Sequence, residues 1–383
     1  MGETPPSIVS GLRPWSVGSL AGEPDAASVS SPAPPDVDGC RRRRQSFASP
    51  HGERMSAPGA PPPLLLAAAA AALAVSALLA WRYRRRAEWV PVGTLSAISL
   101  YPLKSGAPVR CRRARVTPVG LRAGAALDRS LAVVCNDTIL CAMSRRRLVL
   151  VGADFTEAAV TLSAPGAEPL RLPLPTEASA DTPVVRGGQF GTYNTGLDLG
   201  KAASKWLADY FADGKSYTLM YFRSGAVKAR RTVDIKKPYA HFADPGDVAA
   251  FQNVTALSIM CEASLDELNS RMETPVTLDN FRLNLVVAGA APFADDDWTF
   301  VRIGGAVMRR IKAVNRCPNT CVNPRTAEKS EAMEPLRTLR TFRLAKTKEE
   351  RLMYKDSPLL GSALGVDVEG EVEVGDTVYA LKK

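Results

Sequence analysis

The spacing of glycine and proline limits most strongly what this chain can fold into. From about Val92 onward, short stretches rich in branched and aromatic residues alternate with turn residues, and few stretches have helical periodicity. Short strands with few helices favour a β-rich α+β fold with barrel-like sheets over a doubly wound sheet. We expect strands at residues 92–101, 129–136, 158–162, 217–222, 256–260, 284–288, 298–303 and 306–314, and two more within 370–381.

Amphipathic patterns predict a small number of helices among these strands. Residues 198–211 and 334–343 carry apolar residues at helical spacing. Residues 264–267 read Ser-Leu-Asp-Glu, which has the form of a capping box and predicts a short helix ending at Met272. Neither a G-x-G-x-x-G nor a Walker motif occurs, so neither a dinucleotide nor a nucleoside triphosphate is implied.

The N-terminal region differs from the rest in composition. Residues 1–63 are rich in proline, serine, alanine and arginine, which predicts a disordered tail. Residues 64–81 are uncharged and would span about 27 Å as a helix, which predicts a transmembrane anchor. A cleaved signal peptide or a buried alanine-rich helix are the alternatives. The basic linker at 82–91 follows the anchor, so the positive-inside rule places the folded body in the cytosol.

Composition excludes several classes of function. The sequence has only two histidines, too few for zinc proteases or facial-triad iron sites. Seven cysteines at irregular spacing indicate a reducing compartment rather than a disulfide scaffold. The net charge of +10 comes partly from arginines at 41–44 and 82–86, and no aromatic-basic motif accompanies it, so we expect no nucleic-acid binding.

One thiol stands out as a candidate for chemistry. Cys317 follows Arg316 between a predicted strand and a predicted helix, and a cationic run lies just upstream. Neighbouring positive charge lowers the pKa of a thiol, which would make Cys317 a metal ligand or nucleophile. The alternative is an inert buried cysteine. Cys321 is a second thiol in the same loop.

Several segments, taken in order, resemble the MOSC family. They are Leu-Tyr-Pro-Leu-Lys-Ser at 100–105, residues 262–271, Phe-Arg-Leu-Asn at 281–284, Arg-Cys at 316–317, residues 334–339 and the end segment 374–379. The resemblance covers about residues 90–383. It implies an N-terminal MOSC β-barrel-like domain at 92–245 and a MOSC β-barrel domain at 246–383, after the single transmembrane helix.

The resemblance also implies a molybdenum–molybdopterin cofactor and a set of residues that hold it. A soft thiolate suits a metal in a sulfur-rich sphere, and a phosphate suits a lysine and a hydroxyl at a strand end. Solvated lysines, surface salt bridges and a turn asparagine are the alternative interpretations of the same residues. By resemblance the metal ligand and catalytic residue is Cys317, and the cofactor-binding residues are Lys104, Ser105, Arg129, Thr255, Arg282, Asn284 and Cys317.

The function implied by the resemblance is reduction of N-hydroxylated compounds such as amidoximes and hydroxylamines. Electrons would come from cytochrome b5 and NADH–cytochrome b5 reductase. The location would be the outer mitochondrial membrane, with the endoplasmic reticulum membrane as the alternative. A sulfur-carrier module without reductase activity, or a tethered binding protein, remain as alternatives. The family is also associated with pyridoxal phosphate binding, to which we assign no residue.

Departures from the family pattern bear on the shape of the pocket. Gly106 stands where a cysteine is usual, and Leu283 stands where a proline is usual. Ala256 replaces a small hydroxyl residue, and residues 318–320 are Pro-Asn-Thr rather than apolar. We expect these changes to affect the substrate range more than the cofactor.

Overall fold

The computed structural model describes residues 88–237 and 242–382. The predicted tail and transmembrane anchor, and most of the basic linker, lie outside these residues. Within the two described ranges, no helix has the length and apolar character needed to cross a membrane.

The largest sheet closes on itself. It has eight strands, and the pairing of β1 with β17 joins seven of them into a ring that leaves β2 at the edge. We call this ring the seven-strand barrel. Its strands are β1 (Val90–Leu100), β16 (Leu257–Cys261), β17 (Leu285–Ala288), β18 (Trp298–Ile303), β19 (Ala306–Asn315), β20 (Leu359–Val368) and β22 (Thr377–Lys382), with β2 at Val109–Cys111.

A second, smaller barrel lies in the N-terminal half of the described chain. The five-strand barrel consists of β6 (Leu131–Cys135), β7 (Thr138–Ile139), β11 (Val184–Gln189), β12 (Thr192–Asp198) and β13 (Thr218–Tyr221). The remaining strands form three small sheets. One has three strands, β8 (Gly152–Phe155), β9 (Ala159–Ala164) and β10 (Ala167–Pro173), and one has four, β3 (Arg113–Thr117), β4 (Gly120–Ala123), β5 (Ala126–Leu127) and β21 (Gly370–Glu373). The third pairs β14 (Arg230–Arg231) with β15 (Val248–Ala249).

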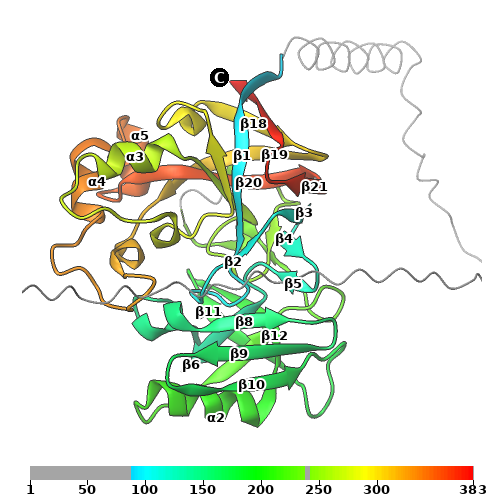
Figure 1. The fold of residues 1–383 in the computed structure, drawn as a ribbon. Helices are drawn as coiled ribbons and strands as arrows, with labels where there is room; N and C mark the ends of the chain where they lie inside the picture. Colours follow the sequence, from blue (N-terminus) through cyan, green and yellow to red (C-terminus); the bar gives the residue numbers. More distant parts are fainter. Residues whose placement is uncertain (1–87, 238–241, 383) are drawn as a thin grey trace, which may run out of the picture. The chain divides into compact units, whose positions relative to one another are not determined.

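Sequence order and spatial order differ at both ends of the described chain. Strand β1, the first strand, pairs with β22, the last, and with β17. Strand β21 likewise pairs with β3. Figure 1 shows β1, drawn in cyan, beside strands of the C-terminal half drawn in yellow to red. Both ends of the folded region therefore complete the same barrel.

Each barrel has its own hydrophobic core. Fully buried side chains such as Leu95, Ile98 and Trp298 fill the seven-strand barrel. Val134 and Met220 belong to a cluster within the five-strand barrel, and a further cluster joins that barrel to β9 and to the apolar face of α2 (Gly200–Phe211). Burial of this amount of branched side chain, at about 25 cal/mol per Å² of apolar surface, is the main force holding the strands together.

The helices fall close to the predicted positions, with one correction. Helix α4 (Leu336–Phe342) lies within the predicted 334–343, and α5 (Lys348–Tyr354) was not predicted. Helix α3 (Ala263–Asn269) begins one residue before the predicted capping box, and no side chain caps it. The prediction of a Ser264 cap was wrong because the Ser264 hydroxyl is buried and accepts a hydrogen bond from the Phe293 backbone instead.

Five short 3-10 helices complete the chain. Two of them flank the site described below: η4, which precedes Arg282, and η6, which follows Cys317. The five are η1 (Arg146–Leu150), η2 (Thr232–Asp234), η4 (Leu278–Asn280), η5 (Ala294–Asp296) and η6 (Pro318–Cys321) among the described residues.

Candidate functional site

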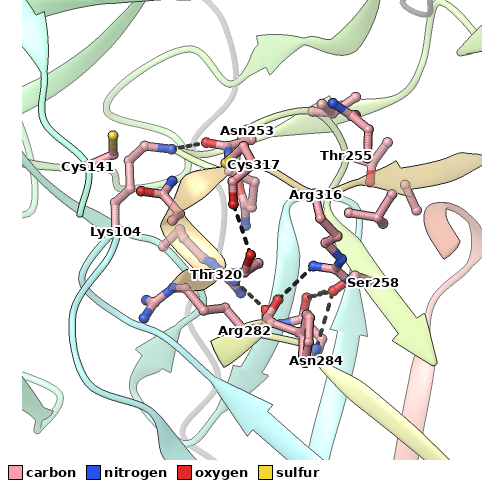
Figure 2. Close-up of a pocket in the computed structure, with 18 of the residues that line it drawn as sticks. Lys104, Cys141, Asn253, Thr255, Ser258, Arg282, Asn284, Arg316, Cys317 and Thr320 are labelled. Atoms are coloured by element: carbon pink, nitrogen blue, oxygen red, sulfur yellow. Dashed lines mark hydrogen bonds between the residues drawn. The ribbon is translucent and has the colours of Figure 1, made fainter. Parts of the chain in front are cut away.

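A single cavity of about 310 Å³ brings together all seven predicted site residues. They come from the chain after β1, the chain before β6, β16 and β17, and the chain after β19. Figure 2 shows several of them converging from these separate elements. Besides the predicted residues, the lining includes Cys141, Phe190, Lys237, Gln252, Asn253, Val254, Leu257, Ser258, Asn280, Phe281, Lys312, Val314, Asn315, Arg316, Asn319, Thr320 and Ala363.

The lining of this pocket is strongly cationic. Among the described residues that line it, none is an aspartate, glutamate or histidine, and six are lysines or arginines. Such a cluster raises the electrostatic potential in a partly enclosed space and favours an anionic ligand. The six are Lys104, Arg129, Lys237, Arg282, Lys312 and Arg316.

The segment after β1 presents Lys104 and Ser105. The Lys104 ammonium donates to the Phe251 carbonyl at 2.8 Å and to the Asn253 side chain at 2.6 Å. Burial, more than any neighbouring charge, lowers the pKa of Lys104 to about 7. An anionic ligand beside this lysine would favour its charged form.

Ser105 and Gly106 turn this segment sharply. Ser105 has a left-handed backbone with φ of 65°, and its hydroxyl accepts from the Ala142 N–H. A Cβ on Gly106 would lie 2.7 Å from Cβ of Leu103 and 2.8 Å from the Val151 carbonyl oxygen. The space for a larger residue is absent here, which gives a physical reason for the glycine at this departure from the family pattern.

Arg129 and Arg282 lie on the ring of Tyr101. Their guanidinium carbons are 4.5 and 4.2 Å from the ring centroid, and both residues have left-handed backbones. Arg129 is held by the fully buried Asp128 at 2.6 Å and donates to the Arg282 carbonyl. The Nη2 atom of Arg282 is buried without a hydrogen-bond partner. Burial lowers the pKa of Arg282 to about 10, although the group stays protonated at neutral pH.

Arg316 fixes the loop that carries Cys317. Its guanidinium donates to the Leu360 carbonyl at 2.8 Å and the Phe281 carbonyl at 2.9 Å, and its Nη2 is buried without a partner. The side chain thus ties the end of β19 to β20 and to the segment before β17. A buried donor without a partner costs about 1–3 kcal/mol, so Nη2 of Arg316 and of Arg282 are poised for acceptor atoms of a ligand.

Cys317 differs from the prediction in its acidity. Burial raises the pKa of its thiol, although the Asn319 backbone N–H and the Arg316 charge act in the opposite direction. The prediction of a lowered pKa was wrong because Arg316 is directed at backbone carbonyls and the thiol is largely desolvated. A half-buried thiol of this kind becomes a thiolate when a metal replaces its proton.

Thr255 and Asn284 line the pocket, and their side chains bond to the protein. The Thr255 hydroxyl donates to the Leu257 carbonyl at 3.0 Å. The Asn284 amide oxygen accepts from the backbone N–H and the hydroxyl of Ser258, and its amide nitrogen donates to the Ser99 carbonyl. Asn284 therefore links three strands at the floor of the pocket, and its predicted contact with a pterin stays a prediction.

Sequence reasoning missed several lining residues. Asn253 holds Lys104, Ser258 holds Asn284, and Asn319 carries a buried amide oxygen with no partner. Cys141 is a further thiol in the lining, and Lys312 a further lysine. The cationic run before Cys317 pointed to Lys312, and the departure at residues 318–320 included Asn319. No local signal marked Asn253, Ser258 or Cys141.

The polar side chains of the pocket suit a metal that is already bound by an organic cofactor. In the described ranges, no group of three or more histidine, cysteine, aspartate or glutamate side chains is placed to hold a metal ion. The pocket instead offers one thiol, several cationic donors and two arginine nitrogens without partners. This combination fits an anionic organic cofactor whose metal takes one protein thiolate.

The comparisons with known proteins agree with this arrangement. Residues 92–214 match the MOSC N-terminal beta barrel domain, and residues 246–379 match the MOSC domain. The chain is 36% identical to mitochondrial amidoxime-reducing component 1 of Xenopus laevis, covering 81% of this chain and 89% of that protein. It is 34% identical to the human protein of that name, covering 80% and 89%, and 34% identical to mitochondrial amidoxime reducing component 2 of Rattus norvegicus, covering 86% and 96%. The chain therefore belongs to the MOSC-domain family, together with these amidoxime-reducing components.

Proposed function

We propose that this protein is a molybdenum-cofactor-dependent reductase of N-hydroxylated compounds such as amidoximes and hydroxylamines. The observation that carries the proposal is a cation-rich pocket without a carboxylate, which holds the Cys317 thiol and the buried partnerless Nη2 atoms of Arg282 and Arg316. The names of the relatives support the choice of substrate class.

We assign each predicted site residue a role in this proposal. Lys104 and Ser105, at a sharp turn, would bind the phosphate of the cofactor, and Arg129 and Arg282 would bind phosphate or pterin acceptors. Thr255 and Asn284 would shape the floor on which the pterin rests. Cys317 would ligate molybdenum, and the metal, when bound, supplies the two-electron redox chemistry.

The electron source and the location are part of the proposal. No nicotinamide or flavin motif occurs in the sequence, so we infer an external electron donor. The family resemblance implies that this donor is cytochrome b5 with its NADH-dependent reductase. The relatives are named mitochondrial, which supports a mitochondrial location. The outer membrane, with the folded body facing the cytosol, is our proposal from the basic linker at 82–91 and the positive-inside rule. Residues 64–81 would be the anchor. Protease added to intact mitochondria should then digest the folded body, whereas protection until the outer membrane is ruptured would reverse the orientation.

The decisive experiment measures metal and turnover on the same preparation. The full chain, purified from a host that makes the cofactor, should contain close to one molybdenum per chain. It should also reduce benzamidoxime to benzamidine with electrons from cytochrome b5 and its reductase. Well-folded protein without molybdenum would remove the proposal. Molybdenum without reduction by any donor would favour the sulfur-carrier alternative.

A further inference from the structure

Lys312 is a buried lysine in the wall of the pocket, and the proposed cofactor contacts do not use it. Only 3% of the residue is exposed, and it lines the same cavity as Cys317. Its ammonium donates to the Ala313 carbonyl at 2.6 Å and the Asn315 side chain at 3.0 Å, and lies 5.3 Å from the ring centroid of Tyr354. Lysine is rarely this deeply buried, so the position calls for a specific role.

The strand that carries Lys312 is shaped irregularly at this point. The pairing of β19 with β20 shifts register between Arg310 and Lys312 and again between Ala313 and Asn315. In a regular strand alternate residues face the same side, whereas Ile311, Lys312 and Ala313 are all buried. Bulges of this kind occur next to active sites, where they redirect a side chain.

The proposed reaction needs a proton source inside the pocket. Reduction of R–NH–OH to R–NH2 breaks the N–O bond, consumes two electrons and two protons, and releases water. Among the described lining residues, none is a carboxylic acid, imidazole or phenol, so the groups that can donate a proton are lysines and thiols. Lys104 is assigned to the phosphate and Cys317 to the metal, and the remaining thiol, Cys141, lies beside Lys104 (Figure 2). Lys237 is exposed, and Lys312 is buried.

We propose that Lys312 is the proton donor of this reduction, protonating the oxygen that departs as water, and this proposal rests on the proposed reductase function. The two electrons come from the external haem-protein donor, and the second proton, which the nitrogen takes up, comes from solvent. Solvent also reprotonates Lys312 before the next turnover, so protons and electrons balance in each cycle.

The electrostatic surroundings of Lys312 suit this role. Burial first, and then the charges of Arg316 and Arg310, lower the pKa of Lys312 to about 7. From α5, the ring of Tyr354 faces the Lys312 ammonium. On β20 the only charged residue is Asp367, which pairs with Arg309. A donor with a pKa near the working pH both gives up and regains a proton readily.

The test compares Lys312→Met, Lys312→Arg and the exposed control Lys215→Met in the full, cofactor-loaded chain. Benzamidoxime is the substrate, and reduced methyl viologen supplies electrons so that partner binding does not enter. We expect Lys312→Met to lower kcat about 100-fold, with KM and molybdenum content unchanged, and to remove the alkaline limb of the kcat profile between about pH 6 and 9. Lys312→Arg should be equally slow because arginine does not release its proton at these pH values.

Each other outcome has a defined meaning. Restored kcat in Lys312→Arg would show that positive charge, not proton donation, is required, and would overturn the proposal. Loss of molybdenum from Lys312→Met would make the residue structural and would also overturn it. An NMR titration of the Lys312 side chain in the loaded protein needs no turnover, and a pKa near 10 would contradict the role. Molybdenum-loaded wild-type protein that reduces no N-hydroxylated compound would instead overturn the proposed function.

Discussion

The two walls of the pocket are built in different ways. The cradle wall consists of Lys104, Ser105, Arg129 and Arg282, which lie on turns at the ends of strands. The β19 wall consists of Lys312, Arg316, Cys317 and Asn319, which lie on β19, on the two residues that follow it and on η6. Three of the four cradle residues have left-handed backbones, whereas none of the four β19-wall residues does.

This difference indicates a division of labour. Left-handed backbone in a residue other than glycine costs on the order of 1 kcal/mol and persists where surrounding contacts enforce it, often at ligand sites. At Arg129 and Arg282 the enforcing contacts are the Tyr101 ring and the Asp128 carboxylate. The β19 wall has no such turns, and Arg316 ties it to two neighbouring backbone segments. We therefore expect the cradle wall to control cofactor binding and the β19 wall to control turnover.

The largest expected effect on turnover distinguishes Cys317, which precedes η6, from Cys321, which ends it. Cys317→Ala should lower benzamidoxime turnover by more than about 100-fold. Replacing a residue that only hydrogen-bonds a metal ligand costs about 10–100-fold, and loss of the ligand itself should cost more. Cys321→Ala should keep most of the activity, since the Cys321 thiol is buried against the Met333 carbonyl. Turnover near wild type in Cys317→Ala, or loss confined to Cys321→Ala, would move the ligand to the other thiol.

A smaller effect is expected on the cradle wall. Arg282→Ala should lower molybdenum occupancy, with roughly tenfold weaker cofactor binding, because a charged donor to the ligand is lost. The activity per bound molybdenum should change little. Arg110→Ala, which removes an exposed arginine paired with Asp279, is the control and should leave occupancy unchanged. If Arg282→Ala kept full molybdenum occupancy but lost turnover, Arg282 would act in the reaction itself. The cradle wall would then not be limited to cofactor binding.

Sequence reasoning located the main strands and the pocket residues because both depend on local pattern or on the family resemblance. The prediction for 298–303 coincides with β18, where buried and half-buried residues lie between clear turn signals. Strand β20 was missed although seven of its residues are buried. It contains two glycines and a serine, which weaken the strand pattern, and its pairing with β16 and β19 is what makes it a strand.

The errors at the site share a physical cause. The acidity of Cys317 was predicted from its neighbour in sequence, and the structure turns that neighbour toward carbonyls of distant segments. Asn253 reaches Lys104 across 149 positions of sequence, so no local signal could mark it. Contacts of this kind are fixed by the strand order of the two barrels, which the residue pattern alone does not give.

The shared ring of Tyr101 offers a way to perturb the cradle wall without removing a cation. Tyr101→Leu should weaken cofactor binding severalfold, because the guanidinium groups of Arg129 and Arg282 would no longer be held by the ring. A cation–π contact of this kind is worth about 0.5–2 kcal/mol. Tyr101→Phe keeps the ring and should behave like the wild type in molybdenum content. If Tyr101→Phe and Tyr101→Leu lowered the content equally, the phenol and not the ring would position the arginines.

The smallest expected effect concerns the stability of the β19 wall. The pKa of Lys312 is lowered to about 7 in the folded protein, well below the ordinary value of 10.5. Between these two pH values the unfolded chain binds more protons than the folded chain, so the contribution of Lys312 to the free energy of unfolding falls as the pH is lowered toward 7. Lys312→Met removes this penalty, so the cofactor-free variant should unfold a few degrees higher than the wild type near pH 7. The difference in unfolding temperature between Lys312→Met and the wild type should shrink as the pH rises toward 10.

The matched control for this stability effect is Lys215→Met, at an exposed position, which should leave the unfolding temperature unchanged at both pH values. A variant that is more stable but turns over more slowly would show that Lys312 is kept in the β19 wall at a cost in stability, as expected for a functional residue. Destabilisation of Lys312→Met at neutral pH would instead mean that the hydrogen bonds to Ala313 and Asn315 outweigh the burial of charge, and Lys312 would then be a structural part of the wall.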